Sequence, residues 1–220
     1  MTGQSPTRAL ASFAARLSID TIPKDVLWKA RQLFADYVST TAAAVREEPA
    51  RALQRFAVAM GGSGARIIGT SLDVAPPWAA LVNGAMGHMA EMDDTHRGTM
   101  SHPGDSLWAT ALALSNAQTS PAQFLTAVIA GYEVALRIGE AIMPDHYRRG
   151  WHTSGTIMEF GCAATASVLL GLDEQRTAWA LGTAAAQASG NFAHLTERAL
   201  TKAFNCGHAA KCGVIAALLA

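Results

Sequence analysis

Residues 23–45 read PKDVLWKARQLFADYVSTTAAAV, and this stretch decides the fold class. Its apolar side chains recur at the spacing of one helix face, in a stripe made of Val26, Leu27, Ala30, Leu33, Phe34, Tyr37 and Val38. The proline at the start fits the first turn of a helix, where its missing N–H would have no partner in any case. The stretch therefore predicts a long amphipathic α-helix.

The same spacing recurs along the rest of the chain. Capping signals accompany it at Ser120-Pro121, at Thr156 with Glu159 three residues later, and at Asp173. The predicted helices cover residues 6–17, 23–45, 50–60, 76–92, 105–118, 121–142, 156–171, 173–190 and 207 onward. About eight or nine helices without an internal repeat predict one all-α domain over residues 1–220, with only a short extended segment at ARIIGTSLDV.

Composition excludes several classes of partner. Seventeen basic residues balance seventeen acidic ones, so no net field attracts nucleic acid or anionic lipid. We find no signal peptide and no apolar run of transmembrane length, which excludes a membrane partner and predicts a cytoplasmic protein. Cys162, Cys206 and Cys212 lack C-x-x-C spacing, so we expect packing residues and neither a disulfide framework nor a structural zinc site.

Ionisable residues gather in HMAEMDDTHRGTMSHPGD, residues 88–105. His88, Glu91 and Thr95 would share one helical stripe if the helix continues that far. Asp93 and Asp94 would then lie at the end of the helix, where acidic groups oppose its dipole at a local cost. A solvated turn is the simpler interpretation. A metal site is the other alternative, but no H-x3-H or H-x-H spacing supports it.

Two further junctions concentrate polar groups. HYRRGWHTSGT, residues 146–156, brings two arginines and two histidines to the start of a predicted helix, where backbone N–H groups attract anions. TKAFNCGHAAKCG, residues 201–213, places Lys202, His208 and Lys211 around Gly207 at another predicted helix start. Each junction alone also reads as a surface loop or turn. Together the three junctions predict a site for a polycarboxylate, with histidine moving protons.

Four ordered segments carry a resemblance to a known family. They are HMAEMDDTHRGTMSHPGDSLWATALAL, GYEVALRIGEAI, HYRRGWHTSGTIMEFGCAATASVLLGLDEQRTAWALGTAAAQASG and LTKAFNCGHAAKCGVIAALLA. Together they resemble the MmgE/PrpD family, which includes 2-methylcitrate dehydratase, cis-aconitate decarboxylase and iminodisuccinate epimerase. The resemblance implies a homodimer whose subunit joins a large helical domain to a smaller α+β lid. It covers the N-terminal helical half, so we expect a helical domain that lacks the lid and is incomplete at its C-terminus.

The resemblance also assigns site residues. The family's acidic motif falls on Glu91, Asp93, Asp94 and Thr95, its first histidine on His102, its second on His152 and its lysine on Lys202. It implies catalytic roles for His102, Asp93, Asp94 and Lys202, substrate binding by Glu91, Thr95, His152 and Lys202, and no metal. Departures from the family pattern are Glu91 in place of aspartate, a longer spacing from Thr95 to His102, and Asn205 in place of a common histidine.

The resemblance implies a cofactor-independent lyase, either a dehydratase or a decarboxylase, that acts on a small di- or tricarboxylate such as 2-methylcitrate or cis-aconitate. An isomerase or epimerase of an amino-dicarboxylate would use the same proton transfer, and a truncated non-catalytic dimerisation module is the alternative from another class. We expect little turnover from these residues alone, because the final helix carries Ile215, Leu218 and Leu219 without evident partners and the site would lie open to water.

Overall fold

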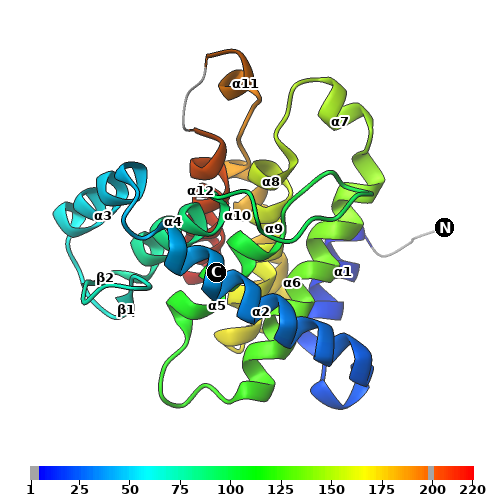
Figure 1. Ribbon diagram of the computed structural model, residues 1–220. Coiled ribbons are helices and arrows are strands. Elements are labelled where there is room, and N and C mark those ends of the chain that lie inside the picture. The colour runs from blue at the N-terminus through cyan, green and yellow to red at the C-terminus, as the bar shows by residue number, and fades with distance from the viewer. Residues whose placement is uncertain (1–4, 198–200) are drawn as a thin grey trace.

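The structure, a computed structural model, describes residues 5–197 and 201–220 and is built from helices (Figure 1). The longer helices are α1 (Pro6–Arg16), α2 (Lys24–Ala44), α3 (Glu48–Met60), α4 (Pro76–His88), α5 (Gly104–Leu114), α6 (Pro121–Ile142), α9 (Met158–Leu169), α10 (Glu174–Gln187) and α12 (Thr201–Leu218). The short helices are η1 (Ile19–Thr21), α7 (Asp145–Arg148), α8 (Thr153–Thr156) and α11 (Ala193–Glu197). The predicted all-α class is confirmed.

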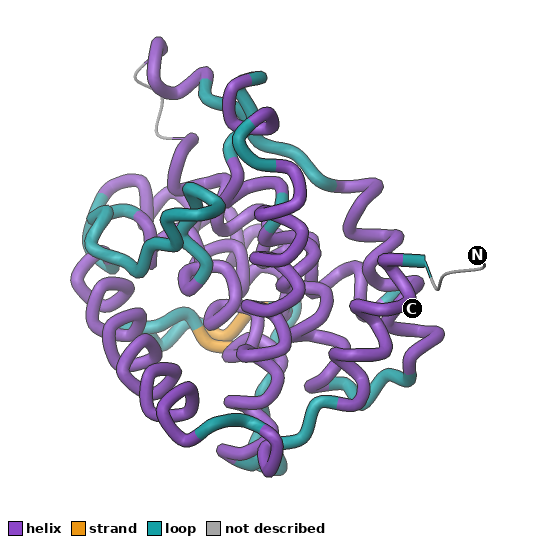
Figure 2. Tube along the Cα trace, turned by 90° about the vertical axis from the view of Figure 1, so that its right-hand side faces the viewer, coloured by secondary structure: helices purple, strands orange, loops and turns teal. Residues whose placement is uncertain are grey.

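The only β-ladder in the described part of the chain is a small ribbon, visible in Figure 2. Strands β1 (Ala65–Arg66) and β2 (Asp73–Val74) pair antiparallel inside the segment predicted to be extended. The two caps predicted at Ser120 and Asp173 are also present. The Ser120 hydroxyl accepts the Gln123 N–H at 3.1 Å, and the Asp173 carboxylate accepts the Arg176 N–H at 2.8 Å. These side chains replace the missing hydrogen bonds of the first helical turn.

Several predicted helix ends are wrong. Helix α4 stops at His88 rather than residue 92, and Glu91 has a positive φ of 49°, so Glu91 and Thr95 do not continue the His88 stripe. The capping box at Thr156 is also wrong. Thr156 ends α8, and its hydroxyl bonds the carbonyl of His152 in the preceding turn.

Three further boundaries differ from the prediction. Helix α5 ends at Leu114 rather than residue 118, and α10 ends at Gln187 rather than residue 190. Helix α12 already begins at Thr201, which places Gly207 inside the helix rather than at its start. The anion-binding helix start predicted around Gly207 is therefore absent.

Helix α12 lies at the centre of the bundle, where it packs against α4, α9, α5 and α10. Its closest neighbour is α4, because Gly207 faces Gly84 and a side chain at Gly207 would overlap the Leu81 carbonyl. The absence of two β-carbons lets the two backbones approach closely, and this approach sets the distance between Lys202 at the start of α12 and His88 at the end of α4.

A second part of the core fixes α2, α5 and α6 together. The Trp108 ring is fully buried and lies 5.1 Å from the Phe34 ring and 5.7 Å from the Phe124 ring, centroid to centroid. Such tilted ring pairs add about 0.5–1.5 kcal/mol to the burial of their area. The packing holds the first residues of α5 beside the loop that carries the acidic motif.

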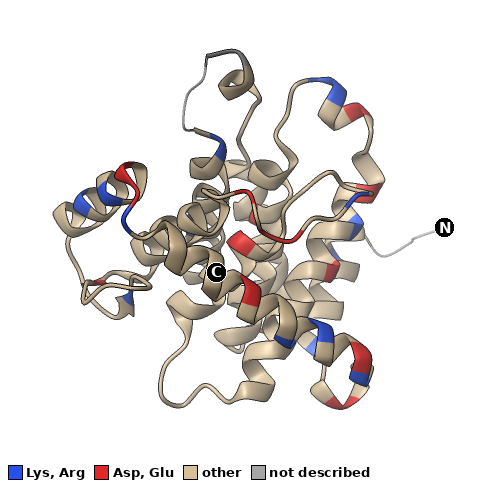
Figure 3. Cartoon of the chain, viewed as in Figure 1, with Lys and Arg blue, Asp and Glu red and all other residues tan. Residues whose placement is uncertain are grey.

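Charged residues are distributed unevenly over this framework. Figure 3 shows Lys and Arg mostly on the outer helices, whereas acidic residues of the loop after α4 and of the first turn of α5 lie in the middle of the molecule. In the described residues, no helix is both long and apolar enough to cross a membrane.

Candidate active site

The loop between α4 and α5, residues 89–103, folds back over the bundle because Asp94 anchors it. One Asp94 carboxylate oxygen accepts the Gly104 N–H at 2.8 Å and the other accepts the Tyr132 hydroxyl at 2.8 Å. Burial raises the pKa of Asp94 despite these two hydrogen bonds. Both oxygens are thus engaged in holding the loop to α5 and α6, and Asp94 faces Tyr132 rather than His102.

Asp93 lies at the centre of a histidine–carboxylate network. Its Oδ2 is 2.9 Å from Nδ1 of His102 and 2.9 Å from Nδ1 of His88, and the His88 nitrogen also lies 3.0 Å from Oδ2 of Asp105. Burial acts to raise the pKa of Asp93, but the hydrogen bonds from the two histidines outweigh it and leave this pKa below its ordinary value. Asp93 is therefore the charged acceptor that orients both rings.

Asp105 is the uncharged member of the same network. Its side chain is 1% exposed, and burial followed by the adjacent Asp93 raises its pKa well above the ordinary range. The Oδ2 atoms of Asp93 and Asp105 both lie within 3.0 Å of Nδ1 of His88, and two buried carboxyl groups at one nitrogen share one negative charge, as in a carboxylate dyad. Because Asp93 accepts at Nδ1 of His102, the Nε2 of His102 is the nitrogen left to exchange protons with a substrate.

The second junction is attached to the same loop. The Ser154 hydroxyl accepts the backbone N–H of His102 at 2.9 Å, and the Thr153 hydroxyl donates to the Met100 carbonyl. His152 is buried, and the Asn205 amide donates to its Nδ1 at 3.0 Å, so its Nε2 carries the hydrogen. Burial lowers the pKa of His152 to about 3, which makes it a neutral hydrogen-bond donor rather than a cation.

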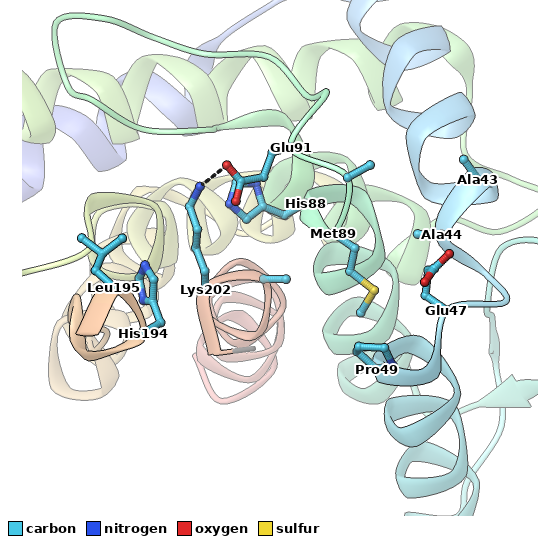
Figure 4. Close-up of a pocket in the computed structure, with 12 residues that line it drawn as sticks. Ala43, Ala44, Glu47, Pro49, His88, Met89, Glu91, His194, Leu195 and Lys202 are labelled. Carbon is cyan, nitrogen blue, oxygen red and sulfur yellow. Dashed lines mark ion pairs between the residues drawn. The ribbon is translucent and has the colours of Figure 1, made fainter. Parts of the chain in front are cut away.

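The third junction brings Lys202 to the same place. Its Nζ lies 2.7 Å from Oε2 of Glu91, and Figure 4 shows this ion pair beside His88. The hydrogen bond from Lys202 lowers the pKa of Glu91. The ammonium group is therefore held by a carboxylate of the protein at the edge of the cavities that it lines.

A cavity of about 560 Å³ joins these groups. Its wall includes Thr95, His102, His152 and Lys202, together with Tyr147, Phe192 and His194. A second cavity of about 780 Å³ adjoins it through Lys202, His194 and Leu195 and reaches His88 and Glu91, as Figure 4 shows. Both volumes suit a small-molecule site. The structure thus brings residues of all three polar junctions to one place.

Sequence reasoning missed part of the site. His88 and Asp105 stood at the two ends of the quoted stretch, but nothing in the sequence indicated that both are buried against Asp93. His194, which lines both cavities, lies in a segment without a recognisable motif. Tyr132 falls inside a helical segment, where an aromatic residue is ordinarily packing.

The ring nitrogens and carboxylate of His88, Asp93 and His102 lie close enough together to suggest a metal site. Their contacts of 2.9 Å are hydrogen-bond lengths, whereas oxygen and nitrogen ligands of a tetrahedral metal lie about 3.3 Å apart. The hydrogen-bond lengths from Oδ2 of Asp93 to both histidine rings favour a proton-transfer network over a metal centre.

Fold and site together define the class of protein. It is an all-α bundle in which a buried histidine–aspartate network and a lysine meet at one cavity. The chain belongs to the MmgE/PrpD family, because residues 8–220 match the family's N-terminal domain.

Individual relatives agree with this assignment. The cis-aconitate decarboxylase-like protein oryM of Aspergillus oryzae is 30% identical over 227 residues, which cover 97% of this chain and 46% of the relative. Cis-aconitate decarboxylase of Aspergillus terreus is 28% identical over 222 residues, with 97% and 45% covered. The human cis-aconitate decarboxylase is 33% identical over 152 residues, with 66% and 31% covered. The chain spans about half the length of the two fungal relatives.

Proposed function

We propose that the chain is the helical domain of a lyase that acts on a small di- or tricarboxylate, and that decarboxylation of cis-aconitate is its reaction. The observation that carries the proposal is the His102 imidazole, held by the Asp93 carboxylate at 2.9 Å in the wall of a cavity shared with Lys202 and His152. The names of the relatives favour the decarboxylase over the dehydratase, the isomerase and the non-catalytic module.

Loss of CO₂ breaks a carbon–carbon bond and leaves the electron pair on the substrate, so a proton must be added to carbon. We assign that proton to Nε2 of His102, with the Asp93 charge stabilising the imidazolium form beforehand. The electron pair left by CO₂ is delocalised over the adjacent double bond and carboxylate of the substrate. Because the substrate itself stabilises this charge, the proposal includes no cofactor.

Lys202 and His152 are the groups that we assign to the substrate carboxylates. Lys202 would exchange its Glu91 partner for a substrate carboxylate, and its charge stabilises the enolate-like state. Neutral His152 would donate a hydrogen bond from Nε2, because Asn205 occupies Nδ1. Thr95, whose hydroxyl lies 3.4 Å from Nδ1 of His102, completes this wall of the cavity.

The homodimer and the cytoplasmic location predicted from the sequence stay predictions.

The test is an assay of the purified protein, as residues 1–220 and with any continuation of its coding sequence. Cis-aconitate, 2-methylcitrate and a chiral amino-dicarboxylate are supplied separately, and CO₂ release, ultraviolet absorbance and optical rotation are followed. From cis-aconitate we expect CO₂ and an unsaturated dicarboxylate one carbon shorter, with little turnover from residues 1–220 alone. Loss of optical rotation without CO₂ would identify an isomerase instead.

His102→Gln should lower kcat by about 100-fold or more, the usual scale for losing a general acid. His96→Gln is the matched control, because His96 lies in the same loop but its ring faces Thr99, at 3.0 Å from Nδ1 to the hydroxyl. Equal kcat values for the two variants would remove His102 from the chemistry.

A further inference from the structure

A separate group of side chains that could hold a metal ion lies on α12 outside the candidate active site. His208 and Cys212 are one turn apart on α12, and Glu159 of α9 faces them. The Glu159 side chain is fully buried, and its Oε2 has no hydrogen-bond partner among the described residues. An oxygen of a buried carboxyl group without a hydrogen-bond partner is costly and requires an explanation.

The distances in this cluster lie within about 0.4 Å of the edges of a tetrahedral metal site. Nε2 of His208 is 3.3 Å from Sγ of Cys212 and 3.7 Å from Oε1 of Glu159, and all three atoms lie within 4.8 Å of one another. Around a tetrahedral zinc ion, nitrogen and sulfur ligands are about 3.5 Å apart, and nitrogen and oxygen ligands about 3.3 Å. The Ser189 hydroxyl is hydrogen-bonded to the same nitrogen at 3.0 Å and would exchange that bond for the cation to become a fourth ligand.

The surroundings also suit the ligands. The Ser189 N–H donates to Oε1 of Glu159 at 3.3 Å, the kind of outer hydrogen bond that orients a metal-binding carboxylate. A thiolate and a carboxylate together offset the charge of a divalent cation, which leaves the buried site neutral.

We propose that Glu159, His208 and Cys212 form a binding site for a zinc-like divalent cation that joins α9 to α12. Binding releases the protons of the Cys212 thiol and the Glu159 carboxyl to solvent, so charge is conserved without any redox step. The site goes beyond the proposed lyase function. It stabilises the wall behind the cavity, because Gly190, next to Ser189, accepts the His152 backbone N–H at 3.2 Å.

Lys211 opposes the cation. Its Nζ lies 3.1 Å from Nδ1 of His208, but a metal on Nε2 requires the ring proton on Nδ1, where it would face the ammonium group. The partly buried Lys211 side chain must therefore turn away when the cation binds. Removing its charge should strengthen binding, whereas a site without a metal would gain nothing from that change.

The experiment titrates the metal-free protein with Co²⁺ and with Zn²⁺. Tetrahedral cobalt bound to a thiolate gives intense visible bands and a sulfur-to-metal charge-transfer band, and a chromophoric chelator reports the Zn²⁺ affinity. We expect both cobalt signals, and a Tm raised by roughly 5–10 °C when Zn²⁺ is 100 times Kd.

Variants locate the site. Cys212→Ser should abolish the charge-transfer band and weaken Zn²⁺ binding by more than about 100-fold, beyond the effect of losing an outer hydrogen bond. Cys206→Ser is the matched control, because it alters the other buried thiol of α12, beside His88 and Asp105. Loss of the band in Cys206→Ser with retention in Cys212→Ser would overturn the proposal, as would the absence of any cobalt signal in the unaltered protein.

Two further variants keep the test decisive if Cys212→Ser fails to fold. Lys211→Met should tighten Zn²⁺ binding by about tenfold, the effect of removing one nearby like charge. Glu159→Gln, which nearly preserves the shape of the side chain, should weaken it by a similar factor or more. Unchanged affinity in both variants would overturn the proposal. None of these readouts depends on lyase activity, so failure here and failure of the proposed function are distinguishable.

Discussion

Asp93 and Asp94 are adjacent in the sequence but have opposite surroundings. Asp93 accepts from His102 and His88, whereas Asp94 accepts from Gly104 and Tyr132. Asp93→Asn should lower kcat by about 100-fold, because the amide can no longer stabilise the imidazolium form of His102. Asp94→Asn should leave kcat within severalfold and reduce the free energy of unfolding by about 1–2 kcal/mol. Steady-state assays and urea unfolding measure the two effects, and the reverse pattern would exchange the two roles.

The buried His152 makes stability depend on pH. Its folded pKa is about 3, whereas the unfolded chain takes up the proton below about 6.5. The free energy of unfolding that the neutral His152 ring contributes is therefore fully present above pH 6.5 and is lost as the pH falls toward 3. From pH 6.5 to pH 5 the loss is about 2 kcal/mol. His152→Gln should remove this part of the acid destabilisation in urea unfolding at the two pH values. An unchanged pH dependence would mean that His152 titrates normally.

At this scale the sequence predicted the residue types of the site better than their partners. His102, His152 and Lys202 were predicted from the family's motifs, and all three line one cavity. The partners His88 and Asp105 were missed, because burial between α4 and α5 is a tertiary property that residue spacing does not encode.

Among the helices, the contact between α4 and α12 determines whether the junctions meet. Gly207→Ala would place a methyl group against the Leu81 carbonyl, and a backbone atom cannot rotate away as a side chain can. We expect a loss of about 2–3 kcal/mol, since overpacking outweighs the gain of about 1 kcal/mol in helix propensity. The measurement is the midpoint of urea unfolding.

Gly182→Ala is the control. Gly182 lies within α10, and a β-carbon there would meet no atom within 4 Å. This variant should be more stable by about 0.5–1 kcal/mol, the helix-propensity gain alone. Destabilisation by both variants, or by neither, would show that close approach at Gly207 is not the cause.

Helix periodicity predicted the existence of the long helices, but it failed at their ends. The apolar pattern after His88 continues through Met92, yet Met92 is 72% exposed because the chain leaves the helix to bury Asp93 and Asp94. Around Gly207, a glycine and two cationic residues suggested a helix start. The close approach to α4 instead requires glycine in the middle of α12.

At the scale of the whole molecule, neutrality and exposed apolar side chains favour self-association. The net charge is zero, so no long-range repulsion keeps copies apart. Leu218 and Leu219 are adjacent and are 53% and 73% exposed. We predict that residues 1–220 associate at micromolar concentration through this end of α12, and that a Leu218→Glu, Leu219→Glu double variant is mainly monomeric in sedimentation velocity. Lys29→Glu is the control for charge, because it changes the net charge by the same two units on the exposed face of α2 without removing apolar surface. If the Lys29→Glu variant were monomeric, the change in charge and not the loss of apolar surface would explain dissociation. A monomeric unaltered chain would refute the prediction.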